Sequence, residues 1–319
     1  MPYNVCHCLL AALVLLLTGC SKDEGFDETK SAEITLRTDV WRMMEGSLAG
    51  ARQAASGLAD ATRAATFDNQ TALRTEGAFT CGVFNNNTMT PYVNYTRVDW
   101  DGTASKWEFS DGKHYWPASG SLDFFAYMPA AAPSYITGPT YTTARAPQFS
   151  CTSLPMTPDG QSATEEFIYA LQTGQNKAGQ GNSGVTMTFQ HPFARIKLQL
   201  SESQEDIRIN SITLKSIKNN GDYVHGTGWT PSGDATNFVF TLNNDYEANH
   251  DFGTYLMMPQ DWAGEIEVNA DWNVWGVSKN HTVSATVPTT WQSGYSYTYT
   301  ITITETDLKV DIAKFTEQW

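Results

Sequence analysis

Apolar and polar residues alternate along much of this chain with a period of two. The pattern begins at residues 32–40 (AEITLRTDV), where Ile34, Leu36 and Val40 fall on one face and charged or hydroxyl side chains fall on the other. Successive side chains of a β-strand point to opposite faces. Residues 32–40 are therefore predicted to form a strand with one buried face.

Short segments of the same kind recur, separated by residues that favour turns. In the first half the predicted strands are residues 79–84, 92–100, 107–109, 114–117, 122–128 and 167–171. Asp-Gly pairs at 101–102 and 111–112 predict hairpin turns between them. In the second half the predicted strands are residues 185–189, 196–200, 207–214, 238–242, 266–270 and 295–303. Many short strands at this spacing predict an all-β protein built from β-sandwiches.

Two segments interrupt the alternation. Residues 41–66 are rich in Ala, Gly and Ser and contain several arginines, which predicts an exposed, protease-sensitive connector. Residues 173–184 (TGQNKAGQGNSG) have no large apolar side chain and resemble a linker. We therefore expect an N-terminal domain over residues 32–183, which includes the connector, and a C-terminal domain over residues 184–319.

Composition supports the fold class and narrows the function. The chain has 319 residues, of which 41% are hydrophobic, so an intrinsically disordered protein is excluded. Aromatic residues make up 12% and there are 24 glycines, which favours β-structure over a helical bundle. The net charge of −14 excludes nucleic-acid binding, because phosphate contacts need a basic surface.

Candidate catalytic chemistry is weak throughout the sequence. There is no zinc motif, nucleophile elbow or phosphate loop, so we expect no catalytic residue, no metal ion, no cofactor and no enzymatic activity. His191 is expected to be a hydrogen-bonded structural residue rather than a base. Glu165 and Glu166 are expected to face solvent. Residues 99–102 (DWDG) resemble part of a calcium loop but lack its closing Glu.

The N-terminus has the features of an export signal. Residues 9–17 (LLAALVLLL) are too short to span a bilayer and predict a signal peptide over residues 1–19. Residues 17–20 (LTGC) resemble a bacterial lipobox, which implies lipidation of Cys20 and a polar tether over residues 20–31. Residues 21–24 (SKDE) resemble the signal that sends Bacteroidales lipoproteins to the outer face of the outer membrane. An ordinary solvated tether is the alternative.

Two cysteines remain after the signal peptide and Cys20 are set aside. Cys81 and Cys151 have no metal-ligand spacing. We expect two buried free thiols, with a single disulfide in an oxidising envelope as the alternative.

Several landmarks together resemble the fimbrillin-like family, the subunits of type V pili in Bacteroidales. Besides the lipobox they are residues 62–66 (TRAAT), 115–117 (YWP), 122–129 (LDFFAYMP), 189–198 (FQHPFARIKL) and 291–299 (WQSGYSYTY). They run in order over nearly the whole chain. The resemblance implies two tandem transthyretin-like (Greek-key) β-sandwich domains.

The resemblance also implies how such a subunit matures. An arginine-specific protease would cut between Arg63 and Ala64 and release the lipidated segment. The displaced strand would carry Ile34, Leu36 and Val40 with it, and the loss would leave a groove with unpaired edges.

A donor strand from another subunit would then fill the groove and build an adhesive fibre. The tail at residues 305–319 has a suitable pattern, because Leu308, Val310 and Ile312 alternate with charged residues. The expected partners are therefore other pilus subunits, the protease, the outer membrane and a surface receptor of unknown nature.

Each of these interpretations has a plainer alternative. Arg63 is one of several nearby arginines and would then be a solvated charge, while the tail would pair within its own domain. The alternative function is a permanently lipid-anchored surface protein, either a pilus anchor or a glycan-binding module. In a glycan-binding module, tryptophans that are otherwise expected in the core or at its rim would form a stacking platform: Trp229, Trp262, Trp272 and Trp275.

Overall fold

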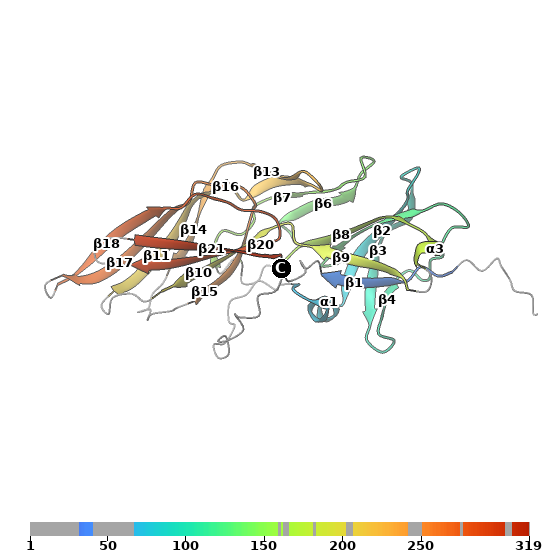
Figure 1. Cartoon of the computed structure of the whole chain (residues 1–319), viewed down its shortest axis with the longest axis horizontal. Helices are drawn as coiled ribbons and strands as arrows, with labels where there is room; N and C mark the ends of the chain where they lie inside the picture. Colours follow the sequence, from blue (N-terminus) through green and yellow to red (C-terminus); the bar gives the residue numbers. More distant parts are fainter. Residues whose placement is uncertain are drawn as a thin grey trace, which may run out of the picture.

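The computed structural model describes residues 32–40, 67–158, 161, 166–180, 183–201, 207–241, 251–274, 277–303 and 308–318. The predicted signal peptide (1–19), the tether (20–31) and the connector (41–66) lie outside the described residues. The described part is almost entirely β-structure, which confirms the all-β prediction. It consists of a barrel at one end, a sandwich at the other, and a smaller sheet beside them (Figure 1).

Seven strands of the N-terminal half close into a barrel in the order β1-β4-β3-β2-β5-β8-β9. The strands are β1 (Leu36–Val40), β2 (Ala78–Asn85), β3 (Pro91–Asp101), β4 (Lys106–Phe109), β5 (Leu122–Met128), β8 (Ile168–Gln175) and β9 (Val185–Gln190). Helix α1 (Gln70–Glu76) precedes β2. The Asn69 side chain caps its N-terminus, and Gly77, at a φ of 80°, ends it in the left-handed conformation. A second short helix, α3 (Lys177–Gln180), follows β8.

The C-terminal half forms two four-stranded sheets that enclose a second core. One sheet has the order β15-β10-β20-β21 and the other the order β14-β11-β17-β18. The strands are β10 (Ala194–Leu200), β11 (Ile207–Ile217), β14 (Thr236–Thr241), β15 (Asp251–Met257), β17 (Glu265–Val274), β18 (Val277–Thr286), β20 (Tyr295–Ile303) and β21 (Leu308–Gln318). Two short strands, β16 (Asp261–Trp262) and β19 (Thr289–Thr290), pair beside them.

A third sheet joins the two halves. Its order is β13-β12-β7-β6, with strands β6 (Ile136–Tyr141), β7 (Pro147–Cys151), β12 (Asn220–Val224) and β13 (Gly228–Ser232). The antiparallel pairing of β7 with β12 links the two halves directly, and in Figure 1 β6, β7 and β13 lie along one side of the molecule. A third hydrophobic cluster packs with this sheet and contains Phe149 and Tyr223.

A buried hydrogen-bond network reinforces this connection. The hydroxyl group of Tyr169, on barrel strand β8, lies 2.7 Å from the Tyr223 hydroxyl and 2.9 Å from Nδ1 of His225. Burial raises the pKa of both tyrosines, so their hydroxyl groups keep their protons and stay able to donate.

Strand β5 is covered on both faces, which explains why residues 122–128 lack an alternation of apolar and polar residues. Phe124, Ala126 and Met128 lie in the barrel core, whereas Phe125 belongs to the third cluster on the other face. A strand covered on both faces is apolar on both. The prediction of a central strand here is confirmed, with β2 on one side and β8 on the other.

Three strand pairings cross the expected boundary between residues 183 and 184. β9 completes the barrel through β1 and β8, and β12 pairs with β7. The division into two domains stays a prediction, and a boundary at residues 191–193, between β9 and β10, fits the sheets better. The transthyretin-like description also stays a prediction.

The junction contains a buried pair that corrects one expectation. Glu166 is completely buried, so the prediction that it faces solvent is wrong. Its Oε1 atom lies 2.7 Å from Nδ1 of His191, and its Oε2 atom accepts a 3.4 Å hydrogen bond from the Phe67 N–H. A buried carboxyl group needs such partners, since its desolvation is unfavourable. The prediction that His191 is a hydrogen-bonded structural residue is confirmed.

Cys81 and Cys151 are both buried free thiols, as expected. Burial raises the pKa of both thiol groups, that of Cys151 to about 12. Because the thiolate is the reactive form, both should resist modification in the folded chain.

We predict that a thiol reagent at about pH 8 labels neither cysteine in the native chain and both in denaturant. The test uses a chain whose Cys6, Cys8 and Cys20 are replaced by Ser, with mass spectrometry as the readout. The same shifts predict that the free energy of unfolding falls above about pH 9, because the thiols then ionise only in the unfolded chain. Rapid labelling of the native chain would contradict the burial.

Candidate functional site

Strand β1 lies between β9 and β4 and closes the barrel. It runs parallel to β9 through five residue pairs, from Leu36 opposite Val185 to Val40 opposite Phe189. Its pairing with β4 is limited to one position, Leu36 opposite Trp107. β1 is therefore held by a full ladder on one edge and by a minimal one on the other.

The segment before β1 adds a few contacts on the β4 side. Glu33 forms an isolated bridge with Tyr115, and the Ile34 N–H donates to the His114 carbonyl oxygen at 2.8 Å. Lys113 and Glu33 form an exposed ion pair at 2.6 Å. Exposed pairs of this kind contribute little to stability.

The apolar face of this segment forms part of the barrel core. Ile34, Leu36 and Val40 are 3%, 4% and 3% exposed and belong to the cluster that contains Phe79 and Phe189. Their predicted burial is confirmed, whereas their displacement stays a prediction. Burying three such side chains contributes about 5–9 kcal/mol.

Thr38 is a buried residue that the sequence pattern left unassigned. Its side chain is on the inner face with Leu36 and Val40, and the residue is 6% exposed. Its Oγ1 atom accepts a 3.1 Å hydrogen bond from Nε1 of Trp107 on β4. The signal in the sequence was its position, two residues from each of its apolar neighbours, but a threonine at that position is also common on an exposed face.

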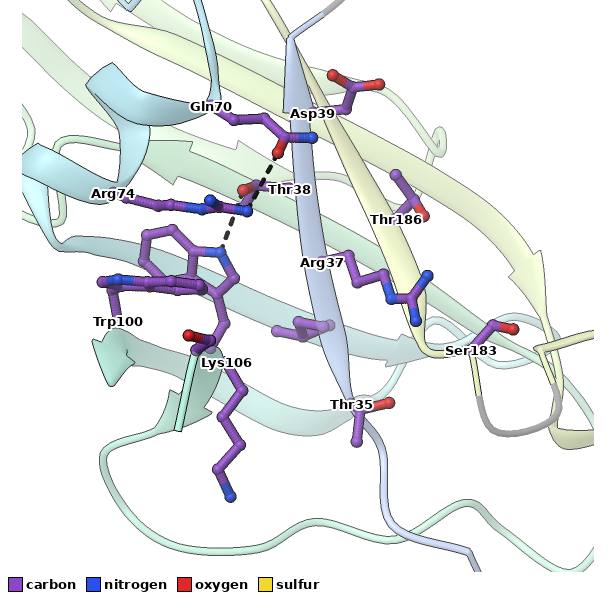
Figure 2. A pocket seen from close by; sticks show the side chains of 13 residues that line it. Thr35, Arg37, Thr38, Asp39, Gln70, Arg74, Trp100, Lys106, Ser183 and Thr186 are labelled. Atoms are coloured by element: carbon purple, nitrogen blue, oxygen red, sulfur yellow. Dashed lines mark hydrogen bonds between the residues drawn. The ribbon is translucent and has the colours of Figure 1, made fainter. Parts of the chain in front are cut away.

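A groove of about 590 Å³ opens where β1 and β4 separate. It is lined by β1, by α1 and by the β3–β4 hairpin, as Figure 2 shows. Arg74 of α1 lies over the Trp100 ring at 4.7 Å, and its Nη2 atom donates to Oε1 of Gln70. Beyond Leu36, this edge of β1 therefore faces side chains of α1 and of the β3–β4 hairpin and not the backbone of a neighbouring strand.

Gly184 lets β9 start close to β1. The Val185 N–H donates to the Thr35 carbonyl oxygen at 2.8 Å. A Cβ atom at Gly184 would lie only 2.5 Å from Oγ1 of Thr35, and the residue has a φ of +78°. Glycine is thus required both for space and for the left-handed conformation.

The C-terminal tail forms the outermost strand of its own sheet. β21 pairs antiparallel with β20, with Leu308 opposite Ile303, Val310 opposite Ile301 and Ile312 opposite Tyr299. This is the plainer alternative for the tail. Its donor role stays a prediction.

The tryptophans proposed for glycan stacking do not form a shared exposed platform where they are described. Trp262 is 2% exposed, donates from Nε1 to the Lys215 carbonyl oxygen and stacks on Trp291. Trp229 packs against the third cluster and donates to the Pro192 carbonyl oxygen at 2.5 Å. The side chains of Trp272 and Trp275 lie outside the described residues.

The remaining predicted site residues, Cys20, Arg63 and Ala64, also lie outside the described residues. Within the described ranges, no group of three or more His, Cys, Asp or Glu side chains could hold a metal ion. In the same ranges, no helix has the length and apolar character needed to cross a bilayer.

We predict that Thr38→Val lowers the free energy of unfolding by about 1–3 kcal/mol, because it leaves the buried Trp107 Nε1–H without its acceptor. Thr38→Ser keeps an acceptor and serves as the matched control. Urea unfolding followed by tryptophan fluorescence measures both variants. Equal stability of the Val variant and the wild-type chain would show that this hydrogen bond contributes nothing.

Solved structures from Bacteroides share this fold at low sequence identity. A fimbrial protein of Bacteroides vulgatus matches with a TM-score of 0.59 and 13% identity, covering 89% of this chain and 99% of that one. A candidate cell adhesion protein of Bacteroides uniformis matches with a TM-score of 0.52 and 14% identity, covering 89% and 97%. Another, of Bacteroides ovatus, matches with a TM-score of 0.52 and 16% identity, covering 90% and 97%.

The sequence itself matches a known family. No curated protein matches the chain. The family model described as fimbrillin-like matches residues 62–319, which is most of its length. This family consists of structural proteins and not enzymes, as the sequence led us to expect. The match and the landmarks together show that the chain belongs to the fimbrillin-like family.

Proposed function

We propose that this chain is a structural and adhesive subunit of a type V pilus, as stalk, tip or accessory subunit. It is exported as a lipoprotein, cut by an arginine-specific protease and assembled by strand exchange. The observation that carries the proposal is the position of β1. It completes the barrel core, yet its covalent link to the other barrel strands runs through the connector at residues 41–66.

The lipid anchor holds the precursor at the outer membrane. The signal peptide at residues 1–19 is removed, Cys20 is acylated, and residues 20–31 are the tether that follows it in sequence. Acyl chains contribute about 0.8 kcal/mol per buried CH₂ group, so several chains together anchor the precursor firmly.

Cleavage between Arg63 and Ala64 would break the covalent link between β1 and the other barrel strands, and it would leave Phe67 in its buried position. Phe67 is buried, and its N–H is bonded to Glu166 at the junction. The chain that remains would thus begin three residues before the buried Phe67. The family match begins at residue 62, next to this site.

Loss of β1 would leave an unfilled site in the barrel, and exposing that site to water is unfavourable. Ile34, Leu36 and Val40 would vacate the core, and the backbone groups of β9 that pair with β1 would lose their partners. Exposed apolar surface and unpaired strand edges favour pairing with another chain. A donor strand restores both, and the tail at residues 305–319 of another subunit is the candidate donor.

A permanently anchored lipoprotein is the competing function, either as a pilus anchor or as a glycan-binding module. The two differ in the fate of the N-terminus, since an anchor keeps Cys20. The burial of Trp262 and the packing of Trp229 weaken the glycan-binding version.

We predict that the protein purified from the cell surface begins at Ala64. Replacing Arg63 with Ala should preserve the link to Cys20 and stop polymer growth, because β1 then stays attached. Arg52→Ala is the matched control, since it removes another arginine of the connector and should change neither result. N-terminal sequencing and the ladder of polymers on mild denaturing gels provide the two measurements.

The opposite pattern would decide against the proposal. If surface protein keeps its lipidated Cys20 throughout, and Arg63→Ala and Arg52→Ala behave alike, the chain is a permanent anchor and not an exchanged subunit.

A further inference from the structure

The groove beside β1 reverses the charge balance of the chain. The whole sequence has 34 acidic against 20 basic residues. Among the described residues that line the groove, Arg37, Arg74 and Lys106 are cations and Asp39 is the one carboxylate. Hydroxyl groups and an amide make up most of the remaining lining, and the volume of about 590 Å³ lies within the range of roughly 300–1,000 Å³ that small-molecule sites occupy. The lining is therefore suited to a polar anion of moderate size.

Arg74 is fixed in an orientation that suits a binding group. Its Cζ atom lies 4.7 Å from the centroid of the Trp100 ring, and its Nη2 atom donates to Oε1 of Gln70 at 3.1 Å (Figure 2). A guanidinium group has five N–H donors in one plane. The stacking uses a face of that plane and the bond to Gln70 uses one donor, so further in-plane donors remain for a ligand. Because the side chain is already ordered, binding a carboxylate costs it little entropy.

The other two cations have different surroundings. Lys106 pairs with Glu108 at 2.5 Å, so its charge is largely compensated. Arg37 is exposed on the outer face of β1, and within the described residues its guanidinium group forms no ion pair. In Figure 2 it reaches toward Ser183 on one side of β1, whereas Arg74 lies on the other side. Two guanidinium groups thus flank the outer face of the strand.

We propose that this groove binds a saccharide that carries a carboxylate group, such as a uronic acid. Arg74 holds the carboxylate, while Arg37 and the hydroxyl groups of Ser183 and Thr186 bond to the hydroxyl groups of the sugar. The site is not the tryptophan platform considered above, because Trp100 supports an arginine and does not stack on the sugar. The inference rests on the adhesive role in the proposed function for its biological purpose, to which it adds a ligand class. Binding itself requires only that β1 is in place.

An extended acidic peptide is the alternative ligand, and the open edge of β1 disfavours it. In a strand, the backbone groups of alternate residues point to the same side. The Ile34 N–H donates on the β4 side, so the even-numbered residues of β1 face the groove. Beyond Leu36 those are Thr38 and Val40, and the Val40 N–H already donates to Oδ1 of Asp39 at 2.9 Å. Strand addition depends on a row of backbone hydrogen bonds, and the edge that remains is too short for one.

The first experiment compares ligands on the full chain, with Cys20→Ser to prevent lipidation. Isothermal titration calorimetry measures the Kd of a galacturonic acid dimer, of the corresponding neutral galactose dimer and of inorganic phosphate. We expect the acidic dimer to bind at least about tenfold more tightly than either of the others, since it alone offers both the charge and the hydroxyl groups. Its Kd should rise at least about fivefold between about 0.05 M and about 0.5 M NaCl, because salt screens exposed charges.

The second experiment assigns the binding to the groove. Arg74→Gln should raise the Kd of the acidic dimer at least about tenfold, since it removes the charged fork. Arg97→Gln is the matched control, because Arg97 is an exposed arginine of β3 that pairs with Asp99 and does not line the groove. Asp39→Asn should lower the Kd about two- to fivefold, because it removes the opposing charge and keeps an oxygen for the Val40 N–H.

The outcomes decide the inference without involving cleavage or polymers. No binding of the acidic dimer at about 10 mM, or equal binding of the neutral dimer, would overturn it. Phosphate that binds as tightly as the dimer would overturn the saccharide and leave a simple anion site. Equal effects of Arg74→Gln and Arg97→Gln would place the binding elsewhere. A gain from Asp39→Asn cannot come from misfolding, so the test stands even if Arg74→Gln proves unstable. The N-terminus of the surface protein tests the proposed function separately, and either can fail alone.

Discussion

The parallel pairing of β1 with β9 is the interaction on which the architecture depends. Without β1 and the segment before it, the barrel has two free edges and lacks the side chains of Ile34, Leu36 and Val40 from its core. The other strands of the barrel follow one another through residues 67–190, whereas β1 arrives across the connector at residues 41–66. Part of the barrel core is thus supplied by a segment that is separated in sequence from the other barrel strands by residues 41–66.

The third sheet holds the barrel and the sandwich together. Pairing of β7 with β12, the aromatic cluster around Phe149 and the hydrogen bond between Tyr169 and Tyr223 fasten barrel and sandwich to each other. Glu166 and His191 add a buried polar contact at the junction. Two units joined in this way would resist separation under tension, as the proposed role in a fibre would require. A flexible linker between independent domains would not do so.

The sequence predicted those parts of the fold that depend on local pattern. Alternation identified β1 and β20, and the apolar run identified β5. It did not find β6 or β13, because Gly138, Pro139 and Pro231 are turn formers that only pairing with a partner strand tolerates. It misjudged Glu166, since its partner lies 25 residues away and nothing nearby in sequence shows that the carboxyl group is buried. At the site, alternation predicted that Ile34, Leu36 and Val40 point inward, but it did not show that the Thr38 hydroxyl on the same face accepts a hydrogen bond from Trp107.

The proposed exchange of β1 for the tail of another subunit raises the question of what would drive it, because both segments offer apolar side chains of the same kind. Burial of the same kinds of side chain cannot decide it. Before the proposed cleavage, residues 41–66 join β1 covalently to its own barrel, and such a link can give an effective concentration on the order of millimolar. A donor from another copy cannot match that value. The proposed cleavage after Arg63 would remove that link, so that β1 could dissociate and a donor strand from another subunit could take its place. In this proposal the direction of assembly would come from the broken peptide bond and not from a difference in side-chain burial.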